Sequence, residues 1–383
     1  MKHSIRIFLL LFIFSSCTKS EKVFPYKDYS YQPSIKANCG VVLDYYSEDI
    51  LYQKEANVVM PPASMIKLVL FYAIMEEIKK GSCTLDTFVP IDHKADYKNQ
   101  PARSSVMYLE SGDVVTVKEL LQGLIIPSGN DAAIALSSFL ATLVNEDGVE
   151  RLNKLVKTLG LVETKIVEPS GYSSENKTTA YEFAKFALAL WKRFPAEVEE
   201  FCTIKRFIYP EQKNIPSGRS GLYPKEHDNH NELVSRFEGV IGLKTGYIDQ
   251  SKANVTLGYS KEGTKFIVVL MGGPGDTGYE RSLQRAIDGA TLLSWATSNY
   301  KALSFKGPTD LTIKEKKSAE VYPVYGVEGE YKTFAIDDIK RMKLVYTVKK
   351  GFKKRESRLP TKVGKWRVVC NKETLASGNL FVD

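Results

Sequence analysis

The stretch that decides the fold is Pro61-Pro62-Ala63-Ser64-Met65-Ile66-Lys67-Leu68. We expect a helix to open after the two prolines, because the residues from Leu68 onward continue as an apolar run. Residues three apart share a helix face, so the Ser64 hydroxyl and the Lys67 amine are predicted to lie side by side. An amine among apolar side chains loses its proton more easily and can activate a neighbouring alcohol. The stretch therefore predicts a nucleophile beside its base.

The context of Ser64 matters, because Ser-x-x-Lys by itself is a weak motif. The same pattern also begins at Ser16, Ser174 and Ser298. Before Ser64, however, two strand-like runs at 41–46 and 50–52 flank a polar turn. A serine at a helix start is often only a cap, so the catalytic interpretation depends on further motifs.

A second motif, Ser128-Gly129-Asn130, lies between predicted helices at 117–126 and 131–144. In the catalytic interpretation, the Ser128 hydroxyl relays a proton to a departing amine, and Asn130 binds Lys67 or the substrate amide. The alternative is an ordinary cap and turn, since Ser-Gly-Asn recurs at 377–379.

A third motif, Lys244-Thr245-Gly246, ends the strand-like run 240–243 and precedes a second run at 253–259. We expect an edge strand on which Gly246 leaves room for a ligand backbone. A cation and a hydroxyl there suit a substrate that ends in a free carboxylate. The alternative is a solvated lysine at a strand end.

Together the three motifs resemble the low-molecular-mass penicillin-binding proteins, the serine D-alanyl-D-alanine carboxypeptidase family, over residues 37–300. The likeness extends to the segments 109–113, 120–133, 168–171, 179–184 and 229–233. It implies a mixed α/β fold, in which an antiparallel sheet from the N-terminal strands and the strands near 238–273 is flanked by helices, with a helical subdomain between.

The resemblance also implies catalytic roles. Ser64 would be the acylated nucleophile and Lys67 its general base. Ser128 and Asn130 would form the second catalytic element. The implied reaction removes the terminal D-Ala from peptidoglycan stem peptides, and β-lactam antibiotics would acylate the same serine.

Substrate binding is implied for the third motif. Lys244 and Thr245 would hold the terminal carboxylate beside Gly246. The backbone N–H groups of Ser64 and Tyr247 would form the oxyanion hole.

Other activities stay open on the sequence. A DD-endopeptidase would use the same residues, and 168–171 also resembles that branch. A lipoprotein that binds wall peptide or β-lactam without turnover would not need Lys67 beside Ser64. Fast β-lactam hydrolysis is disfavoured because 161–172 lacks the Glu-x-x-Leu-Asn arrangement, although Glu163 and Glu168 lie there.

The N-terminus predicts export. A basic start, an apolar run at 7–14 and small residues before Cys17 resemble a bacterial lipoprotein signal at 1–16, with Cys17 lipidated and 17–36 as a tether. The run is shorter than the roughly 20 residues that span a bilayer. The alternative is an ordinary cleaved signal. We therefore predict a lipid-anchored protein of the bacterial cell envelope, on the periplasmic or extracytoplasmic face.

Metal and cofactor chemistry is not expected. The 5 cysteines form no Cys-x-x-Cys pair, and no His-Glu-x-x-His pattern occurs. An envelope location would permit disulfides without requiring them.

The chain is long enough for two domains, predicted at 37–306 and 307–383, with a boundary near Lys306-Gly307-Pro308 after a helix at 280–300. Beyond it, short β-type runs predict a small all-β domain. Residues 308–383 hold 17 Lys and Arg against 10 Asp and Glu, which is +7 of the net +8. Much of this charge lies in Lys349–Arg355, which could attract an anionic lipid or wall polymer. The alternative is an ordinary solvated loop. Nucleic acid is not an expected partner of an exported protein.

Overall fold

The computed structural model describes residues 32–216, 224–305, 310–317, 320–326, 329–353 and 360–383. They form two compact units. The first contains Gln32–Ser260 and Phe266–Ser294; the second, among the described residues, contains Lys261–Lys265 and Trp295–Asp383. The predicted signal peptide, Cys17, most of the tether and the boundary at Lys306-Gly307-Pro308 lie outside the described residues.

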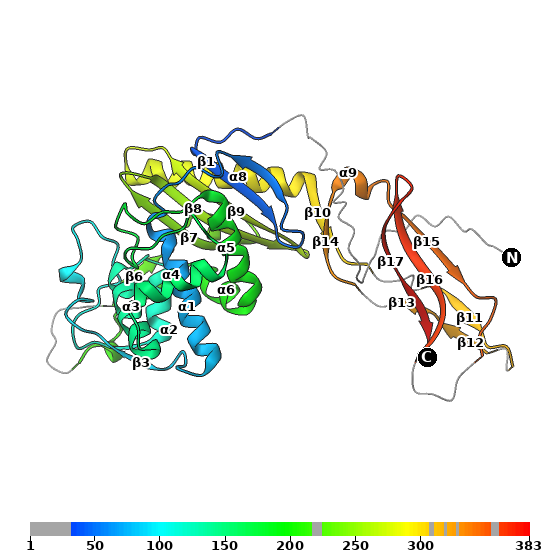
Figure 1. The fold of residues 1–383 in the computed structure, drawn as a ribbon, viewed down its shortest axis with the longest axis horizontal. Helices are drawn as coiled ribbons and strands as arrows, with labels where there is room; N and C mark the ends of the chain where they lie inside the picture. Colours follow the sequence, from blue (N-terminus) through cyan, green and yellow to red (C-terminus); the bar gives the residue numbers. More distant parts are fainter. Residues whose placement is uncertain (1–31, 217–223, 306–309, 318–319, 327–328, 354–359) are drawn as a thin grey trace. The chain divides into compact units, whose positions relative to one another are not determined.

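The first unit is built on a five-stranded sheet with the strand order β2-β1-β9-β8-β7 (Figure 1). Its strands are β1 (Cys39–Asp44), β2 (Ile50–Lys54), β7 (Val240–Ile248), β8 (Lys252–Lys261) and β9 (Thr264–Gly273). The pairs β1–β2, β1–β9 and β7–β8 are antiparallel. This confirms the predicted antiparallel sheet, and β7, which carries the third motif, lies at its edge.

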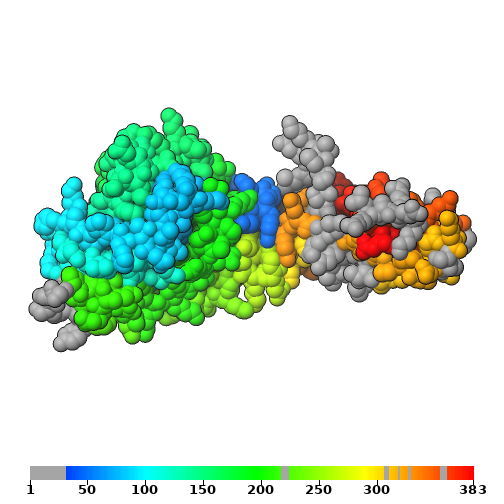
Figure 2. Space-filling model, turned by 90° about the horizontal axis from the view of Figure 1, so that it is seen from below, coloured from blue at the N-terminus to red at the C-terminus, as the bar shows by residue number. Residues whose placement is uncertain are grey.

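The chain between β2 and β7 forms the predicted helical part (Figure 1). Its helices are η1 (Ala63–Ile66), α1 (Lys67–Lys80), η2 (Tyr97–Asn99), α2 (Val117–Ile125), α3 (Asn130–Val144), α4 (Gly148–Thr158), α5 (Ala180–Arg193), α6 (Pro195–Cys202), η3 (Gln212–Asn214) and α7 (Leu233–Arg236). Two short ladders pair β3 (Phe88–Pro90) with β4 (Val114–Thr116) and β5 (Arg206–Ile208) with β6 (Glu226–Asp228). On the face drawn in Figure 2, these segments, coloured cyan to green, make up much of the surface of the unit.

Helix α2 shows why the boundaries fall where the sequence predicts. The Thr116 side chain accepts a hydrogen bond from Glu119 N, and the Glu119 carboxylate accepts one from Thr116 N. This capping box satisfies two N–H groups that have no partner inside the helix. Pro127 lies just beyond the end of α2 at Ile125, so Ser128 and Gly129 lie in the turn between α2 and α3 and Asn130 begins α3.

Helices cover both faces of the sheet. Helix α8 (Gly278–Asn299) packs on one face, where a side chain at Gly289 would meet Leu257 of β8. Trp191 of α5 packs against the next residue, Gly258, which faces the other way. The strands are therefore nearly continuous apolar runs, because both of their faces are covered. One hydrophobic core contains residues of both the sheet and the helical part.

The second unit is mostly β. Strand β10 (Tyr300–Leu303) pairs with β14 (Lys332–Ala335), and β11 (Thr312–Lys314) pairs with β12 (Val321–Pro323). A four-stranded sheet has the order β13-β17-β16-β15, with β13 (Tyr325–Gly326), β15 (Lys343–Val348), β16 (Thr361–Cys370) and β17 (Glu373–Val382). One short helical turn, α9 (Ile336–Ile339), interrupts the strands. Inward-facing residues such as Trp366, Val368 and Leu380 form a separate core.

The described cysteines, Cys39, Cys83, Cys202 and Cys370, are all free thiols with buried side chains. Burial raises the pKa of the Cys202 thiol to about 12. Among the described residues, no helix has both the length and the apolar character needed to cross a bilayer.

Asp288 of α8 fixes the start of the sheet. Its carboxylate accepts hydrogen bonds from Lys36 N at 3.1 Å and Ala37 N at 2.7 Å, just before β1. We expect Asp288→Ala to lower the free energy of unfolding by about 2–4 kcal/mol, since two backbone donors lose a charged acceptor. Asp288→Asn, which keeps one acceptor oxygen, should have a smaller effect. Urea denaturation measures both, and an unchanged midpoint for the alanine variant would contradict this role.

Candidate active site

Ser64 and Lys67 lie at the junction of η1 and α1, one turn apart. Lys67 Nζ is 2.8 Å from Ser64 Oγ, 2.7 Å from Asn130 Oδ1 and 2.7 Å from the carbonyl oxygen of Ser170. The Lys67 side chain is completely buried, whereas Ser64 is partly exposed. The first two motifs thus meet through direct hydrogen bonds, and Ser170 adds a contact that sequence reasoning did not identify.

The surroundings of Lys67 favour a neutral amine. Burial lowers its pKa to about 7. A neutral amine has two N–H donors and one lone pair, and two of its three neighbours, Asn130 Oδ1 and Ser170 O, can act as acceptors alone. The lone pair can then accept the hydroxyl hydrogen of Ser64, for which Ser170 O, at 3.3 Å from Ser64 Oγ, is the other acceptor. Such an arrangement allows the amine to take up this proton.

Asn130 is held in place from two directions. Its Nδ2 donates to Ser104 Oγ at 3.0 Å, and its backbone N donates to Ser105 O at 2.8 Å. The neighbouring Asp131 is fully buried and accepts from the backbone N–H groups of Met107 and Leu109. Burial raises the pKa of Asp131 to about 6, against the lowering effect of these hydrogen bonds. The segment 104–109 is therefore fastened to the start of α3.

Ser128 lines the same cavity as Ser64 and has a strained backbone. Its φ is +62°, in the left-handed region that non-glycine residues rarely adopt. Such strain often accompanies functional positions, because the surrounding structure must enforce it.

Two glycines allow β7 and the loop after α4 to reach the nucleophile. A Cβ at Gly246 would lie 2.9 Å from Pro62 O and 3.0 Å from Ser64 N, and one at Gly171 would lie 2.1 Å from Ala63 O. The sequence pattern predicts that Gly246 makes room for a ligand backbone. The structure places the chain's own turn at 62–64 beside it.

Lys244 is buried behind the strand. Its side chain is 1% exposed, its Nζ donates to Thr245 O at 3.0 Å, and burial holds its pKa well below the usual range. Thr245, Gly246 and Tyr247 line the cavity, whereas Lys244 does not. The third motif therefore presents a hydroxyl and backbone to the cavity, with the Lys244 amine buried behind them.

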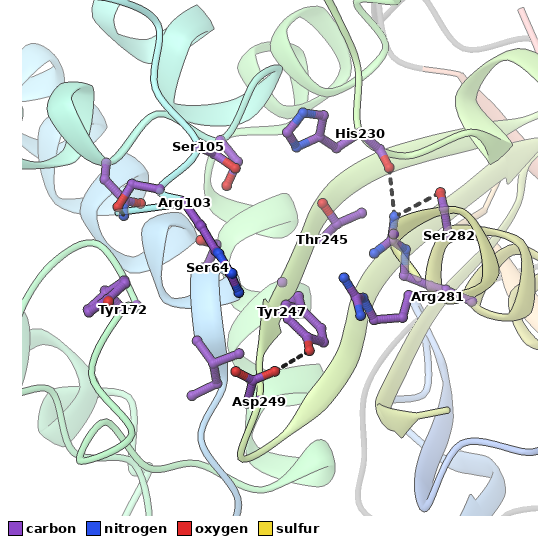
Figure 3. A pocket seen from close by; sticks show the side chains of 18 of the residues that line it. Ser64, Arg103, Ser105, Tyr172, His230, Thr245, Tyr247, Asp249, Arg281 and Ser282 are labelled. Carbon is purple, nitrogen blue, oxygen red and sulfur yellow. Dashed lines mark hydrogen bonds between the residues drawn. The ribbon is translucent and has the colours of Figure 1, made fainter. Parts of the chain in front are cut away.

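The cavity has a volume of about 1010 Å³ and opens beside Ser64 (Figure 3). It is also lined by residues outside the three motifs, among them Arg103, Tyr172, His230, Arg281, Ser282 and Arg285. Arg285 Nη2 donates to His230 O at 2.8 Å, and the Arg281 guanidinium lies 3.9 Å from the centre of the Tyr247 ring. Arg281 and Arg285 were not predicted as site residues. Their spacing of four residues on the helix predicted at 280–300 is the sequence signal that could have identified them.

The carboxylates that left β-lactam hydrolysis open do not line the cavity. Glu168 accepts hydrogen bonds from Ser170 N, Ser170 Oγ, Ser173 N and Asn176 Nδ2. It therefore shapes the loop that presents Ser170 O to Lys67. In the described part of the chain, no group of three or more His, Cys, Asp or Glu side chains could hold a metal ion.

An alcohol beside a buried amine, next to the edge of a sheet, is typical of serine hydrolases that use lysine as the base. Comparison with known proteins narrows this class. A family model described as D-alanyl-D-alanine carboxypeptidase, Peptidase S11, matches residues 27–275. The D-alanyl-D-alanine carboxypeptidase DacF of Bacillus subtilis is 30% identical over 299 residues, covering 75% of this chain and 69% of its own. DacA of Haemophilus influenzae is 30% identical over 308 residues, covering 80% of this chain and 72% of its own.

The structure of penicillin-binding protein 6B from Escherichia coli has the same fold, with a TM-score of 0.67 and 24% identity, over 94% of this chain and 99% of that one. The chain thus belongs to the D-alanyl-D-alanine carboxypeptidase family of serine peptidases, the low-molecular-mass penicillin-binding proteins. The predicted family and fold are confirmed.

The pKa of Lys67 gives a test by pH. We expect the rate of acylation by a fluorescent penicillin to rise with pH with a midpoint near 7, because the neutral fraction of the amine grows through its pKa. Lys67→Ala should slow acylation about a thousandfold. Lys79→Ala, which removes an exposed lysine from the same helix, is the matched control. A pH-independent rate between 5 and 9 or so would rule out Lys67 as the base that titrates.

Proposed function

We propose that this protein removes the terminal D-Ala from peptidoglycan stem peptides through an acyl-enzyme on Ser64. Ser64 Oγ attacks the carbonyl carbon of the penultimate D-Ala while Lys67 accepts the hydroxyl proton. The bond to the last D-Ala then breaks, and Ser128 gives its hydroxyl proton to the departing amine while it takes up the proton that Lys67 had accepted, so that Lys67 is neutral again. Water hydrolyses the resulting ester, which frees Ser64 and the shortened peptide.

Transition-state charge is stabilised by the backbone in this proposal. Ser64 is the second residue of η1, where the N–H group has no partner inside the helix. This N–H and that of Tyr247 donate to the oxyanion. A substrate strand can add to the edge strand β7, with its terminal carboxylate at the Thr245 hydroxyl and near the buried Lys244 amine, whose charged form the bound carboxylate favours.

The observation that supports the proposal most strongly is the set of three contacts at Lys67 Nζ. A protein that merely binds wall peptide gains nothing from a desolvated amine aimed at a hydroxyl, because burying that amine costs free energy. β-Lactams present a reactive amide to the same hydroxyl, so they are proposed to acylate Ser64.

Incubation with muropeptides tests this function. The purified protein should shorten a pentapeptide by one D-Ala, seen by mass spectrometry, and leave cross-linked muropeptides intact. Ser64→Ala should abolish both this release and penicillin labelling. Ser174→Ala removes the serine of another Ser-x-x-Lys pattern, away from the cavity, and should have no effect. Resolved cross-links would indicate an endopeptidase instead, and labelling of Ser64→Ala would remove the nucleophile assignment.

We further propose that the protein is exported and anchored to the membrane by a lipid on Cys17, so that it works on the wall. Lys349–Arg355 would add contact with an anionic surface; Lys354 and Arg355 of this segment lie outside the described residues. The nearby sheet supports the idea, because Lys343, Lys365 and Arg367 are exposed on one face of β15 and β16. Within the described ranges, none of these three is in an ion pair.

Two experiments test the lipid anchor and the basic surface separately. Cys17→Ala should move the protein from the detergent phase to the aqueous phase of a detergent extraction. In that background, Lys343→Gln, Lys365→Gln and Arg367→Gln together should weaken sedimentation with vesicles that contain anionic lipid, most clearly at low salt. Wild-type protein found in the aqueous phase, with unmodified Cys17, would defeat the lipid anchor.

A further inference from the structure

Among the charged side chains that line the cavity, two of opposite sign come from elements far apart in the sequence. Arg103 comes from the loop before the fastened segment 104–109, and Asp249 follows the end of β7. Both line the cavity together with Ser64, and Figure 3 shows the Arg103 side chain pointing into it. Neither is needed by the reaction proposed above.

Both charges are available to a ligand. Over the described residues, Arg103 makes no ion pair, so its guanidinium and the Asp249 carboxylate do not neutralise each other. Asp249 accepts a hydrogen bond from the Tyr247 hydroxyl and is otherwise exposed. The cavity mouth therefore offers a cation and an anion with space between them.

The backbone of Arg103 is held in a defined position relative to the proposed catalytic groups. Its φ is +67°, a left-handed conformation that costs free energy for a residue with a Cβ. The next two residues, Ser104 and Ser105, are hydrogen-bonded to Asn130, which itself binds Lys67. The Arg103 backbone thus has a fixed position relative to the nucleophile.

The direction of the substrate places a particular residue between these charges. With the terminal carboxylate at Thr245, a peptide that runs along β7 passes Ser64 and continues toward Asp249. Four strand residues span about 13 Å, so the last two residues of the peptide occupy the first half of this distance. The residue before the D-Ala-D-Ala dipeptide then lies at the mouth, near Arg103 and Asp249.

We propose that Arg103 and Asp249 form a subsite for a diamino acid whose side chain ends in both an ammonium and a carboxylate. Arg103 binds the carboxylate and Asp249 the ammonium. This inference rests on the proposed function, since it assumes that the peptide is cut at Ser64. It makes the enzyme selective for stem peptides with a zwitterionic third residue.

Two pentapeptides test the subsite, one with meso-diaminopimelate and one with L-lysine at the third position, because they differ by one carboxylate. Wild type should show a kcat/KM about fivefold higher for the diaminopimelate peptide, the size expected for one solvent-accessible ion pair. The difference between the two peptides should come from KM, and it should become smaller as the salt concentration rises. Arg103→Gln should turn over both peptides equally, at the rate of wild type on the lysine peptide. Asp249→Asn should weaken both, since both carry the ammonium.

Lys94→Gln is the matched control, because it removes an exposed charge from the same loop outside the cavity and should keep the preference. Equal kcat/KM for the two peptides in wild type, with D-Ala released from each, would overturn the subsite and leave the proposed function standing. A preference that persists in Arg103→Gln would also overturn it. If wild type released no D-Ala from either peptide, the proposed function would fail, and this inference with it.

Discussion

The site depends on keeping water away from one amine. Lys67 is excluded from solvent by its own apolar helix, and its remaining neighbours are a hydroxyl, an amide oxygen and a carbonyl. Water at this position would favour the ammonium, which cannot accept the Ser64 proton as the proposed mechanism requires. The helical part, the turn before α3 and the loop held by Glu168 each supply one wall of this enclosure. Stability and reactivity are therefore coupled, since loosening any wall admits solvent to Nζ.

Close backbone approach is the second requirement. The turn at Ala63 has a φ of +50°, and glycines at 171 and 246 face it with no room for a Cβ. These contacts bring the edge strand, the helix start and the loop to one point without side chains between them. The proposed substrate strand adds to β7 where Thr245, Gly246 and Tyr247 line the cavity.

Much of the fold and of the candidate site could be predicted from the sequence, because the main features depend on residues close together in the chain. Hydrophobic period and proline position predicted the helices at 117–126 and 131–144, and the spacing of Ser64 and Lys67 predicted their contact. The contact of Lys67 with Ser170 and the burial of Lys244 could not be predicted, since they depend on how remote segments pack. Arg103 was missed for the same reason. Nothing in its neighbours distinguishes it from a solvated arginine until the loop is seen fastened to Asn130.

The four described thiols have a consequence for maturation. Each is enclosed by the core, and burial raises its pKa. Thiolates are the species that oxidants and disulfide exchangers attack, so these four side chains offer them almost no reactive sulfur in the folded state. If the proposed export takes the chain into an oxidising compartment, folding itself protects these cysteines, and they are open to oxidation only until the core has closed.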